Sequence, residues 1–310
     1  MAWRPPRLRT GLICGSVLAG LVAACTPAEP LSVRIAALDW VAPGGDPVLL
    51  LTTKPSTCLT QTSDAALMGE LLFNSPLLLG GQAAKAELHC ASCHVNGRGN
   101  GDFAFQGVSG NAGTADVTHG LFGPARSDDT FNPVPIPDLA MPEGQSRVDR
   151  DTAGILEAFL AAQIIEEFSG PAPAETTIDA LAAYIRAVDH GACRPTDTEP
   201  LTWRDDIQRV ETGLRLLEGA RDGSVIDKRA VANAMRAALG RLYARYPAGR
   251  HAPLRQRLLA LSRAIDGGQV NGVGEEDLKA IEGLLAKHED GSLFNPTLLR
   301  LALADRENAE

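Results

Sequence analysis

Basic residues are scarce relative to acidic residues in this 310-residue sequence. It contains 29 Lys and Arg against 38 Asp and Glu, which gives a formal net charge of −9. Without the three arginines among the first ten residues, 26 bases face 38 acids and the net charge is −12. A surface this acidic disfavours nucleic acid and favours a protein partner with a basic or neutral surface.

The apolar run near the N-terminus is too short for a transmembrane helix. It covers residues 11–24, whereas a membrane span needs about 20 apolar residues. Three arginines and no acid precede the run, and small residues end it. This order is typical of a secretory signal, so we expect residues 1–24 to be a signal peptide and the protein to be exported.

The end of this signal carries a candidate lipidation site. Val22-Ala23-Ala24-Cys25 resembles a bacterial lipobox, which implies cleavage before Cys25 and lipidation of its sulfur. We therefore expect a protein on the periplasmic side of the envelope, anchored in the inner or outer membrane. Residues 25–63 would be the tether and a short irregular or strand-containing segment. The alternative is an ordinary signal peptide, which leaves a soluble periplasmic protein.

One stretch carries the signature of a cofactor, namely Cys90-Ala91-Ser92-Cys93-His94. A Cys-x-x-Cys-His run attaches a c-type haem. Cys90 and Cys93 share one face of a helical turn, so each thiol can add to one haem vinyl group, and His94 is the expected first axial ligand of the iron. A zinc site needs a second Cys or His pair and a thioredoxin-like redox pair needs a βαβ context, and the sequence has neither. We expect one covalently bound haem c.

The sequence has only six cysteines, and two of them remain unassigned. Cys58 and Cys193 lie outside the signal, the lipobox and the haem motif. In the oxidising compartment that export implies, such a pair predicts a disulfide. Closing a loop of this length is worth about 4 to 5 kcal/mol in the chain-entropy model. The alternative is two unrelated buried thiols.

Local patterns divide the region before the haem motif into two parts. Leu31–Trp40 and Val48–Thr53 are rich in β-branched and aliphatic residues and predict short strands. Apolar residues then recur at helical spacing, which predicts a helix with Ser63 or Asp64 as its N-cap. We expect this helix to open a haem domain over residues 64–195.

The chain beyond a short linker at residues 195–200 is periodic at helical spacing, and we expect a helical bundle over residues 201–310. Thr202 is the N-cap candidate of its first helix. His251 and His288 are isolated in the sequence and are expected at the surface. The apolar positions of the five predicted helices are, in order, Ile207, Val210, Leu214 and Leu217; Val231, Met235, Leu239 and Leu242; Leu254, Leu258 and Leu261; Leu278, Ile281, Leu284 and Leu285, opened by Glu275; and Leu298 to Leu303.

Several segments of the first half resemble the bacterial di-haem cytochrome c peroxidase and MauG-like superfamily. They are Met68–His94, with its Gly-x-x-Leu-Phe helix, then Thr118-His119-Gly120, Asn132–Leu139 and Ile155–Val188. The resemblance covers about residues 64–192, and only the haem motif is individually specific. It implies a mainly α protein, in which a cytochrome c-like helical haem domain is followed by an appended C-terminal helical bundle.

Two departures separate this sequence from the family pattern. The superfamily normally carries two haem motifs, of which the second haem stores an electron, and this sequence has one. The expected aromatic-Asp-Gly-Arg segment is also missing, because the sequence there reads AMPEGQSRVDR. The resemblance therefore implies a single-haem member whose peroxidase activity does not follow automatically.

The second axial ligand of the iron has two candidates. His119 stands where the family places a displaceable distal histidine. Met141 follows His94 by 47 residues, a separation at which small electron-transfer cytochromes often place a methionine ligand. Methionine ligation raises the potential and histidine ligation lowers it, and an open or water-bound site is a third option.

Three functional hypotheses follow from these residues. The first is one-electron transfer at the bacterial envelope with a redox partner protein of basic or neutral surface. The second is an enzyme, a peroxide-activating haem oxidoreductase in which His119 is the catalytic residue. The third is a membrane-anchored scaffold that captures a redox partner through residues 201–310.

Overall fold

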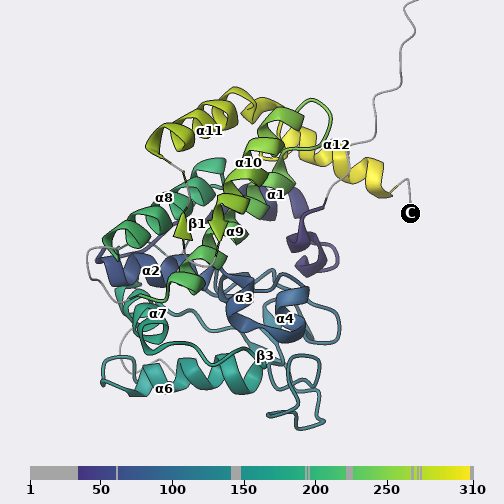
Figure 1. Ribbon diagram of the computed structural model, residues 1–310. Coiled ribbons are helices and arrows are strands. Elements are labelled where there is room, and N and C mark those ends of the chain that lie inside the picture. The colour runs from purple at the N-terminus through teal and green to yellow at the C-terminus, as the bar shows by residue number, and fades with distance from the viewer. Residues whose placement is uncertain are drawn as a thin grey trace, which may run out of the picture. The chain divides into compact units, whose positions relative to one another are not determined.

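The computed structural model describes residues 34–307 except 61, 141–147, 193, 195, 221–225, 267–268, 271 and 273. The described chain is mainly helical, as the apolar periodicity predicts (Figure 1). The predicted signal peptide, Cys25, Met141 and Cys193 lie outside the described residues. The helices are η1 (Ala36–Trp40), α1 (Pro47–Thr52), α2 (Asp64–Phe73), α3 (Pro76–Leu79), α4 (Gly81–Lys85), α5 (Cys90–Cys93), η2 (Val95–Gly97), α6 (Ile155–Ala162), η3 (Gln163–Glu167), α7 (Glu175–Ala187), η4 (His190–Ala192), α8 (Trp203–Gly219), α9 (Lys228–Arg245), α10 (Ala252–Ala264), α11 (Glu275–Lys287), η5 (Glu289–Gly291) and α12 (Pro296–Glu307).

The strands of the described chain form short antiparallel pairs. The first pair joins the segment before α2 to the segment that leads into α8. The second pair belongs to the loop between η2 and α6. The pairs are β1 (Thr53–Pro55) with β4 (Thr198–Pro200), β2 (Thr114–Ala115) with β3 (Val134–Pro135), and β5 (Ile265–Asp266) with β6 (Gln269–Val270).

The segment before α2 differs from its sequence prediction. The strands predicted at Leu31–Trp40 and Val48–Thr53 are wrong over most of their length, because Ala36–Trp40 forms the 3-10 helix η1 and residues 48–52 belong to α1, while Thr53 begins β1. The Asp46 carboxylate accepts hydrogen bonds from the backbone N–H groups of residues 48 and 49, and Pro47 occupies the first helical position. An aspartate N-cap followed by proline starts a helix even in an aliphatic stretch.

The helices α2 and α7 cross at close range. Ser63, one of the two predicted N-cap candidates, caps α2, and its hydroxyl accepts the N–H of Ala66 at 3.2 Å. A Cβ atom at Gly69 would collide with the Ala180 carbonyl oxygen and with the side chain of Tyr184. Only glycine therefore lets these two helices approach so closely, and this contact holds the framework that flanks α5.

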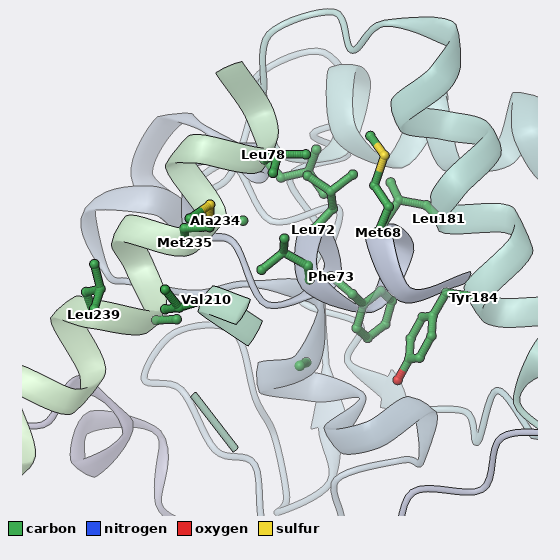
Figure 2. Packing of buried hydrophobic residues seen from close by; sticks show 14 of the residues in the cluster. Met68, Leu72, Phe73, Leu78, Leu181, Tyr184, Val210, Ala234, Met235 and Leu239 are labelled. Atoms are coloured by element: carbon green, nitrogen blue, oxygen red, sulfur yellow. The ribbon is translucent and has the colours of Figure 1, made fainter. Parts of the chain in front are cut away.

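One hydrophobic core joins this pair to the helices that follow the linker. The helix α2 lies against α7 and also against α8 and α9. Figure 2 shows side chains of α2 and α7 beside Val210 of α8 and Met235 of α9. Leu72 is 1% exposed, and Val210 and Met235 are fully buried in the same cluster. The core thus contains residues from both 64–195 and 201–310.

The helices predicted after residue 201 are confirmed as α8 to α12. The Thr202 hydroxyl accepts the backbone N–H of residue 204, and α11 begins at Glu275. The expectation that His251 is at the surface is wrong, since it is 1% exposed at the N-terminus of α10. Its ring lies between Tyr246 and His288, a contact between elements that the sequence does not reveal.

The last helix packs on the first. Leu299 and Ala302 of α12 form a small cluster with Val48 and Leu51 of α1, separate from the main core.

None of the helices in the described chain has the length and apolar character to cross a bilayer.

Candidate functional site

The helix α5 brings two free thiols together on one turn. The backbone N–H of His89 donates to the Ser92 hydroxyl at 3.1 Å, and the N–H of His94 donates to the Cys90 carbonyl at 3.0 Å. These bonds close a single helical turn, so Cys90 and Cys93 lie on neighbouring positions of one face. Both cysteines are free and half-buried.

The two thiols are protonated at neutral pH. Burial of the sulfur atoms in densely packed protein raises the pKa of Cys90 to about 12. Burial, and secondly the neighbouring Cys90, raise the pKa of Cys93 to about 12. Reactive dithiols of redox enzymes instead have a lowered pKa and a thiolate nucleophile. This environment is therefore poorly suited to dithiol exchange.

The imidazole of His94 is held in one tautomer. Its Nδ1 lies 3.0 Å from the carbonyl oxygen of Pro137, and because a carbonyl only accepts, Nδ1 carries the proton. The lone pair of Nε2 is therefore available to a metal ion. Burial lowers the pKa of His94 to about 4, although the Pro137 bond and Asp138 raise it. His94 is thus neutral, which is the ligand form.

A buried ion pair fixes the segment that carries this carbonyl. Arg98 is 5% exposed, and its Nε donates to the Asp138 carboxylate at 2.7 Å. The backbone N–H of Leu139 donates to the Gly97 carbonyl at 2.9 Å. The turn after His94 and the segment 136–139 are thereby joined by side-chain and backbone bonds, so the Pro137 oxygen has a defined position under the His94 ring.

His119 has the opposite tautomer. Its Nδ1 accepts the backbone N–H of Leu121 at 3.1 Å, so in the neutral ring the proton lies on Nε2. The side chain is partly exposed on a loop that the Asp116 carboxylate stabilises through the N–H and hydroxyl of Thr118. The described contacts of His119 do not include His94 or the thiols of α5, and its role as sixth ligand stays a prediction.

Cys58 is fully buried and is disulfide-bonded in the structure. Its carbonyl accepts a hydrogen bond from the backbone N–H of Asp189 at 2.9 Å. The next residue, Leu59, forms an isolated antiparallel β-bridge with Val188 at the end of α7. This end of α7 lies shortly before Cys193 in the chain. Since Cys193 is outside the described residues, the disulfide between Cys58 and Cys193 stays a prediction.

Sequence reasoning missed an ionic cluster at the start of the haem motif. Nε and Nη2 of Arg241 donate to the Asp206 carboxylate at 2.9 and 2.7 Å, and Nη1 of Arg209 donates to it at 3.3 Å. Burial by itself raises the pKa of Asp206, but Arg241 and Arg209 lower it below its usual value. The sequence offers only the i, i+3 spacing of Asp206 and Arg209, which surface helices also show.

Comparison with protein-family models, curated proteins and solved structures gives no match for this chain. No group of three or more His, Cys, Asp or Glu side chains in the described chain is arranged to hold a metal ion. The function is therefore inferred from the residues of the site.

Proposed function

We propose that this protein is an exported c-type cytochrome with one covalently bound haem, and that it transfers single electrons at the bacterial envelope. The observation that carries the proposal is the arrangement of α5. Two free thiols share one turn, and the next residue, His94, presents Nε2 as a free lone pair because Pro137 binds Nδ1. These are the groups that would hold a c-type haem, the thiols through covalent bonds and the imidazole through the iron.

The protonated state of the thiols suits covalent attachment. Cys90 and Cys93 would hold the haem through thioether bonds, each S–H being added across one vinyl group with the sulfur on one carbon and the hydrogen on the other. No net oxidant or reductant is consumed. The raised pKa of Cys90 and Cys93 keeps both sulfurs protonated and protects them from oxidation before attachment. The bound haem iron then supplies the one-electron redox couple.

The framework around α5 supports a cytochrome c-like arrangement. The ring of Phe73 on α2 lies 6.5 Å from that of His94 and 5.1 Å from that of Tyr184 on α7, centroid to centroid. A close helix crossing at Gly69 thus flanks the proposed axial ligand. Together with the haem motif, this supports assignment to the cytochrome c peroxidase and MauG-like superfamily as a single-haem member.

The tautomer of His119 bears on the second ligand. With its proton on Nε2, the ring donates a hydrogen bond rather than a lone pair, so it ligates iron only after the Leu121 bond is broken. This favours Met141 as the ligand of an electron carrier. It also supports a second candidate function, in which His119 donates from Nε2 to a peroxide at an open sixth position and the protein is a peroxide-activating oxidoreductase.

The remaining parts of the proposal concern location and partners. The signal and lipobox support a protein that a lipid on Cys25 anchors at the periplasmic face of a membrane. The acidic excess supports a redox partner with a basic or neutral surface, attracted over a longer range at low salt. Since one core unites both halves of the chain, residues 201–310 contribute to the haem-binding framework as well as to any docking of a partner.

Absorption and low-temperature EPR spectra of the ferric, haem-loaded protein test this proposal. A low-spin spectrum with the near-infrared band of methionine ligation, unchanged by peroxide, supports the electron carrier. A high-spin spectrum and rapid turnover of peroxide would reject the carrier in favour of the enzyme. In that case His119→Gln, which keeps an N–H donor, should retain more activity than His119→Leu.

A further inference from the structure

Two aromatic side chains at the start of the haem motif have buried polar atoms without partners. The rings of Trp40 and His89 meet edge to face, with centroids 5.9 Å apart and planes at 84°. In the described chain, neither Trp40 Nε1 nor His89 Nδ1 has a hydrogen-bond partner, and both atoms are inaccessible to solvent. An unpaired buried polar group destabilises the fold, so a pair of them at one place indicates a missing ligand.

Both residues are fixed to the haem-binding segment. His89 directly precedes Cys90. The carbonyl of Trp40 accepts a hydrogen bond from the backbone N–H of Ala104 at 2.7 Å, and Val41 forms an isolated antiparallel β-bridge with Phe103. The chain around Trp40 therefore lies along the loop that follows the motif, so the pair occupies the space between the entrance to α5 and this loop.

The chemistry of the pair selects an acceptor. An indole N–H only donates hydrogen bonds, and a neutral imidazole with its proton on Nδ1 also donates from that atom. Burial, followed by Arg241 and Arg209, lowers the pKa of His89 to about 3, so the ring is neutral. The Asp206 carboxylate acts in the opposite direction and raises the pKa of His89. Within the described residues, Nε of Arg209 is a further buried donor without a partner. Arg209 also pairs with Glu70 at 3.6 Å, so the charges of the cluster balance, and the preference for an acceptor rests on the unpaired N–H donors.

We propose that Trp40 and His89 bind a carboxylate, and that in the haem-loaded protein this carboxylate is a haem propionate. The assignment rests on the proposed function, because attachment at Cys90 and Cys93 brings two propionates to this part of the chain. Donation from Trp40 Nε1 and His89 Nδ1 stabilises the ionised propionate and satisfies both orphaned atoms. Trp40 is therefore a haem-binding residue that lies before the motif and outside the recognised segments.

The test compares Trp40→Phe with wild type in the full-length, haem-loaded protein. Phenylalanine keeps most of the ring packing and removes the N–H. Loss of a hydrogen bond to a charged group should raise the proton affinity of the propionate about tenfold or more. The pH dependence of the midpoint potential should shift accordingly, and the propionate bands in the resonance Raman spectrum should move. Trp203→Phe is the matched control, since Trp203 Nε1 donates to Glu289 at 3.0 Å instead.

Two variants of His89 test the proposal even if Trp40→Phe does not fold. His89→Phe should reproduce the shift, and His89→Gln, which keeps a donor, should restore it in part. Unchanged propionate bands and an unchanged pH profile in both Trp40→Phe and His89→Phe would overturn the inference, because no propionate would then accept hydrogen bonds from these atoms. Absence of covalent haem from the wild-type protein would instead reject the proposed function, so the two failures are distinguishable.

Discussion

Nδ1 of His94 lies 3.0 Å from the carbonyl oxygen of Pro137, 43 residues further along the chain. This bond leaves Nε2 as the nitrogen that would bind iron in the proposed haem site. Because the carbonyl belongs to a segment that Arg98 ties to the turn after His94, the orientation of the proposed ligand depends on side chains outside that site.

Removing Arg98 should destabilise the protein and loosen the His94 ligand. Arg98→Ala deletes a buried partner of Asp138 and should lower the free energy of unfolding by about 2 to 4 kcal/mol, as measured by urea unfolding. Arg215→Ala is the matched control, since Arg215 pairs with Asp64 at an exposed position and should change stability little. Equal effects of the two substitutions would contradict the role given to Arg98.

Gly69 should tolerate no side chain. Gly69→Ala places a methyl group against the Ala180 carbonyl, so α2 and α7 must separate, and the free energy of unfolding should fall by about 1 to 3 kcal/mol. Gly240→Ala serves as the control in α9, where a Cβ meets nothing within 4 Å, and should stabilise by about 0.5 to 1 kcal/mol. Thermal melts of both variants would reveal these opposite signs, and the same sign for both would refute the close crossing.

The two halves of the chain should unfold together. Met235 on α9 is fully buried in the core that α2 shares, so Met235→Ala should cost about 2 to 5 kcal/mol. Haem absorbance and far-ultraviolet circular dichroism should then shift to the same lower denaturant midpoint. A haem transition that stays in place while the helical signal moves would indicate independent domains. Leu301→Ala, at an exposed position of α12, should leave both signals nearly unchanged.

Acid should weaken the protein through His251. Its Nε2 donates to the Gly291 carbonyl at 2.8 Å, and its Nδ1 is buried without a partner in the described chain. Burial, followed by His288, Arg250 and Arg255, lowers the pKa of His251 below its usual 6.5, so the unfolded chain binds a proton more readily than the folded one. Stability should therefore decline as the pH falls below 6.5, by at most about 1.4 kcal/mol per pH unit from this group.

His251→Gln isolates this contribution. Glutamine keeps a donor for the Gly291 carbonyl but does not titrate. The free energy of unfolding of the variant should therefore fall less steeply between pH 7 and pH 5 than that of wild type. Urea unfolding at several pH values gives both slopes. Identical slopes would show that protonation of His251 is not linked to unfolding.

Local signals predicted much of this structure, and contacts between distant segments account for what they missed. Apolar periodicity located α8 to α12, and the caps Ser63 and Thr202 were readable because a cap acts within one helical turn. The N-cap and proline at Asp46-Pro47 were also readable, but the aliphatic run after them favoured a strand. The pairing of Trp40 with His89 depends on tertiary contacts for which the sequence carries no local pattern.

The most direct measurement is the mass of the full-length protein after export from a bacterium that attaches c-type haem, taken under denaturing conditions. We expect the mass of the processed, lipidated chain plus one haem, with the haem retained after acid and organic extraction. Replacement of both Cys90 and Cys93 by alanine should abolish this added mass. A wild-type protein that carries no haem under these conditions, and whose Cys90 and Cys93 react as free thiols, would contradict the central claim.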